Sequence, residues 1–180
     1  NQRQDEYGGS LENRARLIME IIDGIRARCQ PQFQVGLRLS PERFGLNLQE
    51  IRDVAAEIMR QGKIDYLDMS LWDVEKEPNE AEFQGKSLMS YFTELPRGDV
   101  RLGVAGKIMS AERALSVLDA GCDFVLIGRG AILRHDFPER VRSDASYQSP
   151  AIPVSAAHLA AEGLGPAFIK YMGNWPGFVE

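Results

Sequence analysis

Four short apolar runs, each followed by a polar or glycine-rich turn, constrain the fold of this chain more than any other feature. They are residues 33–39, 64–69, 100–104 and 124–127, and segments with helical spacing separate them. This alternation predicts a parallel α/β fold, because parallel strands need long crossover connections and these are usually helices. Ligands of such folds bind beyond the carboxyl ends of the strands, where the turns lie.

The helices between these runs have recognisable start and stop signals. Ser10 is a predicted N-cap for a helix over residues 11–28. Asn47 and Glu50 form a capping-box pattern ahead of a second helix, which Gly62 is expected to end. Further helices are predicted at 88–95, at 111–120 after a Ser110 cap, and in short stretches at 131–133, 138–142, 155–161 and 166–171.

Composition excludes several classes of protein. A chain of 180 residues with 44% hydrophobic content can bury a core, and its net charge of −5 without a long basic run argues against nucleic-acid binding. No stretch approaches the length of about 18 apolar residues that a membrane span requires. Cys29 and Cys122 lack the spacing of a disulfide framework or metal site, which predicts two reduced thiols in a cytoplasmic protein. We expect no bound metal.

The turns after the third and fourth runs indicate a phosphate-bearing ligand. Gly106 and Gly128 stand where a backbone N–H could approach a phosphate, and Arg129 could grip the phosphate oxygens. Four strands can form a small open sheet or half of an eight-stranded barrel. In barrels the phosphate site is commonly built after the seventh and eighth strands, with a short extra helix. If the four strands are numbers five to eight, the pattern fits.

The run from Asp5 to Arg14, DEYGGSLENR, resembles the segment before the fourth barrel helix in the Old Yellow Enzyme family of flavin-dependent oxidoreductases. Residues 35–40 resemble the family's fifth strand, and residues 127–129 resemble the end of its eighth. The resemblance implies an α/β fold, a TIM (β/α)8 barrel to which this chain supplies strands five to eight. Residues 1–149 would be the C-terminal half of that barrel, and residues 150–180 a helical extension of the same domain.

The same resemblance implies an FMN-dependent enzyme that reduces activated C=C bonds of a small-molecule substrate with hydride from NADH or NADPH. A homo-oligomer is a further expectation. Asp5, Tyr7 and Arg14 are expected to serve structure, with Arg14 pairing with Asp5 or Glu12. The chain opens at Asn1 without a methionine, and we expect it to be a fragment.

Individual site residues follow from the resemblance. Arg38 matches the arginine that faces the pyrimidine side of the flavin, where a guanidinium would stabilise the negative charge of the reduced form. In an apolar strand this arginine needs a buried anionic partner. Gly106, Gly128 and Arg129 match the phosphate-binding positions. Trp72 would line the substrate pocket or cover the barrel rim. The family often has glycines at this position, so the resemblance does not identify the substrate.

The family's catalytic groups lie outside the match. Its substrate-holding donors and its proton-donating tyrosine precede the Asp5–Arg14 run, so this chain is expected to be inactive alone. His135 and His158 match neither position, and no Ser-His-Asp set is evident. Two alternatives remain open. One is a non-redox phosphate-binding barrel, an isomerase or lyase. The other is a half-barrel assembly module that pairs with a second copy to cover its sheet edges.

Overall fold

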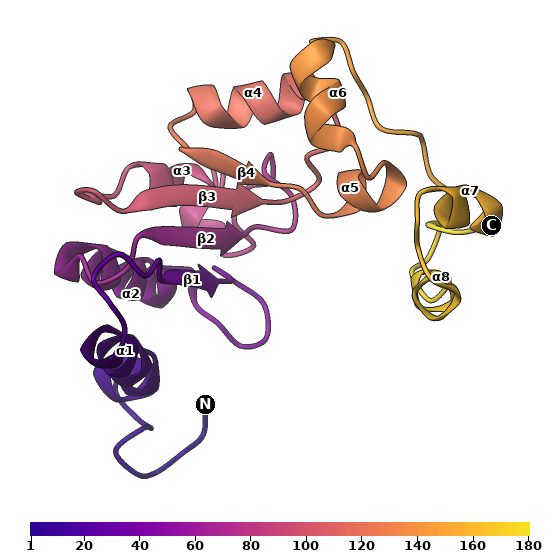
Figure 1. Ribbon diagram of the computed structural model, residues 1–180. Helices are drawn as coiled ribbons and strands as arrows, with labels where there is room; N and C mark the ends of the chain where they lie inside the picture. The colour runs from indigo at the N-terminus through magenta and orange to yellow at the C-terminus, as the bar shows by residue number, and fades with distance from the viewer.

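The computed structural model describes residues 1–180 and contains one parallel sheet with helices between its strands (Figure 1). The sheet has four strands in the order β1-β2-β3-β4, and each pairs in parallel with the next. The prediction of parallel strands in chain order is confirmed. The elements are α1 (Leu11–Arg28), β1 (Gly36–Leu39), α2 (Leu48–Gln61), β2 (Tyr66–Ser70), the 3-10 helix η1 (Ala81–Phe83), α3 (Ser90–Thr93), β3 (Arg101–Ala105), α4 (Ala111–Asp119), β4 (Phe124–Leu126), α5 (Arg129–Leu133), α6 (Phe137–Ser143), α7 (Ala156–Ala161) and α8 (Pro166–Met172).

The predicted N-cap side chains are present in the structure, but the capping box is incomplete because the Glu50 carboxylate does not bond back to the Asn47 N–H. The side chains of Ser10, Asn47 and Ser110 each accept a hydrogen bond from the backbone N–H three residues later, which satisfies a donor that the helix leaves free. Gly62 follows α2 with a φ of 63°, a left-handed conformation that glycine adopts without steric cost.

Two elements are about half as long as the sequence pattern predicts. The strand expected from Phe33 begins at Gly36, because a turn closed by a hydrogen bond from the Phe33 N–H to the Gln30 carbonyl precedes it. The helix expected over 88–95 is reduced to α3, although Leu88 and Leu95 are both buried. Burial within an irregular connection therefore produced the helical spacing there.

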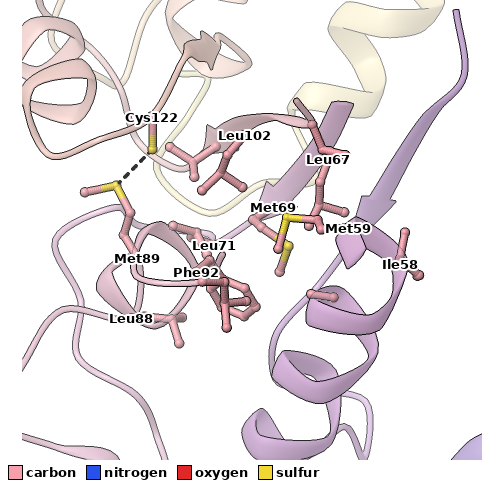
Figure 2. Packing of buried hydrophobic residues seen from close by; sticks show 14 of the residues in the cluster. Ile58, Met59, Leu67, Met69, Leu71, Leu88, Met89, Phe92, Leu102 and Cys122 are labelled. Atoms are coloured by element: carbon pink, nitrogen blue, oxygen red, sulfur yellow. Dashed lines mark hydrogen bonds between the residues drawn. The ribbon is translucent and has the colours of Figure 1, made fainter. Parts of the chain in front are cut away.

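One face of the sheet is apolar and covered by helices. Leu67 and Met69 of β2 and Leu102 of β3 point into a core that α2 and α3 complete, as Figure 2 shows. Ile58 and Met59 of α2 and Phe92 of α3 lie against these strands. Beside them the Cys122 Sγ lies 3.7 Å from the Met89 Sδ. This continuous core fixes the strands and thereby the turns at their carboxyl ends.

The opposite face of the sheet carries a different set of residues. The Tyr66 ring lies over Gly36, and a Cβ there would come within 2.0 Å of it. The Phe124 ring likewise covers Gly103, and the two rings meet edge to face at 5.7 Å. Arg38 also stands on this face. The helices of this chain leave the face uncovered, because they pack on the other side.

The C-terminal segment forms a second, smaller core beyond the carboxyl ends of the strands. In Figure 1 the strand arrowheads point toward the side where α5, α7 and α8 lie. This cluster consists of Leu133 from α5 together with Val154, Leu159, Met172 and Phe178. None of the helices combines the length and apolar character needed to cross a membrane.

The N-terminal run is held to α2 through Arg14. Its guanidinium donates to both carboxylate oxygens of Glu50, at 2.7 and 2.6 Å, and to the Gly9 carbonyl. The expected partners Asp5 and Glu12 are therefore wrong, and Asp5 pairs with Arg3 instead. The structural role expected of Arg14 is seen, since the bidentate pair joins the turn before α1 to the next helix.

Candidate functional site

A cavity of about 220 Å³ lies where the carboxyl ends of all four strands meet. Five of its lining residues are those that the sequence singled out: Arg38, Trp72, Gly106, Gly128 and Arg129. They come from β1, from the turns after β2, β3 and β4, and from the first residue of α5. The sheet thus brings together residues that are up to 91 positions apart in the chain (129 − 38).

Arg38 is anchored by two groups of the neighbouring strand. Its Nε lies 3.3 Å from the Asp68 Oδ2, and its Nη2 donates to the Ser70 hydroxyl at 2.9 Å. The Asp68 side chain is 7% exposed and the Arg38 side chain 61% exposed. Asp68 is the buried anionic partner that an arginine in an apolar strand requires. The guanidinium is held at its base and open to the cavity.

Asp68 has an unusual environment for a carboxylate. Burial raises its pKa above the ordinary value, and the positive charge of Arg38 opposes this only in part. Its second oxygen, Oδ1, is buried and has no hydrogen-bond partner. A buried acceptor without a partner costs free energy. A hydrogen-bond donor from outside the chain would therefore be favoured at the Asp68 Oδ1.

Trp72 is held in a left-handed backbone conformation with φ of 66°, which costs a residue other than glycine of the order of 1–3 kcal/mol. Its carbonyl accepts a hydrogen bond from Arg129 Nη2 at 3.2 Å. The guanidinium carbons of Arg43 and Arg129 lie over its ring, 4.4 and 5.8 Å from the centroid. Two arginines therefore surround an indole that is itself 53% exposed, at the edge of the cavity.

The two predicted site glycines, Gly106 and Gly128, differ in the space around them. A Cβ at Gly106 would lie 2.8 Å from the Asp73 backbone nitrogen, so glycine is needed there for the close approach of the turn after β2. A Cβ at Gly128 would meet nothing within 4 Å. The space beside Gly128 is thus free for a group from outside the chain. Lys107, next to Gly106, pairs with the Asp73 carboxylate at 2.8 Å.

The structure adds residues that sequence reasoning missed. Ser70, Ile132 and Trp175 also line the cavity. Ser70 stands two positions after Asp68, so strand alternation could have placed it on the Arg38 face. Nothing in the sequence pattern points to Trp175, which lies in the C-terminal segment and reaches the cavity only through tertiary packing.

His135 and His158 lie outside this cavity and connect the C-terminal segment to α5. Glu162, whose side chain is 6% exposed, accepts from Arg134 Nη1 at 2.6 Å, from the His135 backbone at 3.0 Å and from His135 Nδ1 at 2.8 Å. His158 Nε2 donates to the Leu133 carbonyl at 2.9 Å. Burial alone would raise the pKa of Glu162, but the His135 and Arg134 contacts lower it overall. His135, Asp136 and Glu162 have the residue types of a metal site. The Glu162 carboxylate, however, already accepts hydrogen bonds from Arg134 and His135.

The chain matches the family model described as the NADH:flavin oxidoreductase / NADH oxidase family over residues 1–148. It is 30% identical over 155 residues to a probable NADH-dependent flavin oxidoreductase of Bacillus subtilis, a match that covers 82% of this chain and 41% of that protein. It is also 30% identical over 165 residues to a cinnamate reductase of Clostridium sporogenes, covering 80% of this chain and 25% of that one. The chain therefore spans less than half the length of these curated relatives.

Solved structures share the fold. Morphinone reductase in complex with tetrahydroNAD aligns with a TM-score of 0.61 and 31% identity, over 84% of this chain and 40% of that one. The old yellow enzyme homologue from Zymomonas mobilis aligns with a TM-score of 0.65 at 23% identity, over 84% and 42% of the two chains. The resemblance to the Old Yellow Enzyme family is confirmed. This chain belongs to the NADH:flavin oxidoreductase / NADH oxidase family.

Proposed function

We propose that this chain is the C-terminal half of an FMN-dependent ene-reductase, and that its strands are numbers five to eight of a (β/α)8 barrel. One observation carries the proposal: Arg38, Trp72, Gly106, Gly128 and Arg129 line a single cavity at the carboxyl ends of the strands. The family match supports the flavin chemistry. The chain covers about two fifths of the aligned morphinone reductase structure, which supports the half-barrel assignment.

The residues around the cavity fit FMN. A phosphate needs backbone N–H groups and a cation, which the turn at Gly128 and Arg129 offers beside open space. The flat flavin ring needs apolar contacts and, at its pyrimidine end, positive charge. Arg38 supplies this charge on a fixed base. Arg38 and Arg129 therefore divide the site into a pyrimidine end and a phosphate end.

The chain's own contribution to the reaction is binding and charge stabilisation. When bound, FMN would supply the two-electron chemistry that links hydride from NADH or NADPH to an activated C=C bond. Arg38 stabilises negative charge on the pyrimidine side because Asp68 and Ser70 hold its guanidinium in one place. Trp72 shapes the rim where a small substrate enters. The groups that hold and protonate the substrate belong to the other half of the barrel.

The uncovered sheet face agrees with this assignment. Tyr66 and Phe124 pack over Gly36 and Gly103 as inward-facing residues of a barrel would, and β1 and β4 are both unpaired at their outer edges. The missing strands would pair with these edges. In this proposal residues 150–180 extend the same domain. The free thiols Cys29 and Cys122 are in keeping with a cytoplasmic enzyme.

FMN titration of two proteins tests the proposal. The longer protein that contains this chain should bind FMN and, without oxygen, oxidise NADPH when an enone is added. Residues 1–180 alone should bind FMN weakly and show no turnover. Failure of the longer protein to bind FMN would refute the flavin assignment. Turnover by the isolated chain at a similar rate would instead refute the half-barrel assignment.

A second candidate follows from the same exposed edges. Two copies of this chain could pair β1 with β4 and cover each other's open face, giving a binding module without catalysis. Sedimentation equilibrium separates this from the first proposal. A defined dimer that fails to bind FMN would favour the module. No observation favours a non-redox isomerase or lyase over the oxidoreductase family to which the chain belongs.

A further inference from the structure

Residues 149–180 lie outside the family match, yet one of them reaches the candidate flavin site. The family model ends at residue 148, whereas the cavity is lined by Trp175. We propose that the C-terminal segment, residues 150–180, completes the flavin pocket and that the Trp175 ring is a direct wall for the apolar part of the isoalloxazine. This inference rests on the proposed function.

The segment is fixed to the helix that follows the phosphate turn. Leu159, Met172 and Phe178 pack with Leu133, and Ile132 lies against the same cluster. Leu133 and Ile132 belong to α5, which begins at Arg129. The carboxylate of Glu162 also binds Arg134 and His135 at the end of α5. The position of Trp175 is therefore set relative to Arg129 by packing and by ion pairs.

Trp175 itself is held by aromatic neighbours. Its ring meets Tyr171 and Phe178 edge to face at 6.2 and 6.1 Å between centroids. Such contacts fix a ring orientation, and the remaining surface of Trp175 forms part of the cavity wall. A rigid, flat, apolar surface is the chemistry that contacts an aromatic ring system.

The distribution of polar groups indicates which part of the flavin Trp175 faces. The charged donors of the lining are Arg38 near the end of β1, Lys107 after β3 and Arg129 after β4, and Lys107 is already paired with Asp73. Trp175 lies with the apolar side chains of Ile108, Leu126 and Ile132 in the lining. The dimethylbenzene end of the isoalloxazine has no hydrogen-bonding groups, so it suits this wall. The phosphate and the pyrimidine suit the arginines.

The test measures FMN dissociation constants of the longer protein that contains this chain and of its variants. Trp175→Leu keeps apolar volume for the packing of the segment but removes the ring, and should weaken FMN binding roughly tenfold. Trp175→Phe keeps a ring and should stay within about threefold of the unmodified protein. Phe168→Ala is the matched control. Phe168 is 43% exposed in the same segment, stacks only on Tyr171 and does not line the cavity.

Circular dichroism and thermal unfolding without FMN accompany each titration, so that a variant with a lost fold is recognised. If Trp175→Leu is unfolded, the comparison of Trp175→Phe with Phe168→Ala still decides, because only the former should change the visible absorption spectrum of bound FMN. Equal affinity and an unchanged spectrum in the folded Trp175 variants would overturn the inference. Absence of FMN binding in the unmodified protein would refute the proposed function instead.

Discussion

The Arg38 Nε lies 3.3 Å from the Asp68 Oδ2, and this ion pair joins β1 to β2 with a buried carboxylate beneath an exposed guanidinium. The two residues are direct partners in the parallel register of these strands. Asp68 has no other hydrogen-bond donor. The Asp68 carboxylate and the Ser70 hydroxyl orient Arg38 toward the cavity, and they thereby hold its positive charge in one position.

Replacing Arg38 by Ala should lower the reduction potential of FMN bound to the longer protein. The anionic reduced form would lose its counter-charge, at a cost of about 1.5–3 kcal/mol for a hydrogen bond to a charged group. Equilibration with redox dyes measures the potential. Arg101→Ala is the control, because Arg101 lies on the same sheet face at the amino-terminal end of β3. An unchanged or raised potential in Arg38→Ala contradicts the role.

Replacing Arg129 by Ala should weaken FMN binding by about 1–3 kcal/mol, the cost of leaving phosphate oxygens without one of their hydrogen-bond donors. Isothermal titration of the longer protein measures the change. Arg43→Ala is a suitable control, since Arg43 also lies over the Trp72 ring but does not line the cavity. Equal FMN affinity in the Arg129 variant would remove this residue from the phosphate site.

The two glycines should respond oppositely to alanine. Gly106→Ala places a methyl group 2.8 Å from a backbone nitrogen and should lower the free energy of unfolding by about 1–3 kcal/mol through overpacking. Gly128→Ala meets no atom within 4 Å and should leave stability nearly unchanged while it weakens FMN binding. Urea unfolding and FMN titration of both variants check this. Normal FMN affinity in Gly128→Ala would show that no phosphate lies there.

Glu162→Gln should loosen the C-terminal segment in a pH-dependent way. The His135 and Arg134 contacts hold the pKa of Glu162 below its ordinary value of 4.5 in spite of burial. Because the folded-state pKa of Glu162 is lowered, its carboxylate stabilises the fold fully above the ordinary pKa of 4.5. This stabilisation is lost as the pH falls through the folded-state pKa. At neutral pH the variant should be less stable by about 1–3 kcal/mol.

Urea unfolding at neutral pH and at about pH 3.5 checks the Glu162 prediction. The stability difference between the variant and the unmodified chain should shrink at the lower pH. His135→Ala removes only one of the donors and should give a smaller loss. A difference that stays constant with pH would show that the carboxylate charge does not hold the segment.

Much of the site was predictable because its residues occupy regular positions. Arg38, Gly106, Gly128 and Arg129 stand at or after the ends of apolar runs, and parallel strands bring such ends to one edge of the sheet. The need of Arg38 for a buried anion was predictable too. The partner Asp68 follows once strands β1 and β2 are paired in register.

Other features depended on contacts between distant segments. The pattern at residues 88–95 predicts a longer helix than α3. Apolar residues buried in an irregular connection have the same spacing as those on one face of a helix, so the pattern does not distinguish the two. Arg14 pairs with Glu50 and not with a residue of its own run, because two helices approach there. Side-chain ion pairs across helices carry no signal in local periodicity.

The sequence by itself determined the strand order, the helix caps and the family, because periodicity, capping residues and the Asp5–Arg14 run are local properties of the chain. Only the tertiary structure decided that Trp175 lines the same cavity as Arg38, 137 residues away (175 − 38). That contact requires the packing of α7 and α8 on α5. Such packing arises from the burial of apolar surface between segments, and no local pattern encodes which surfaces meet.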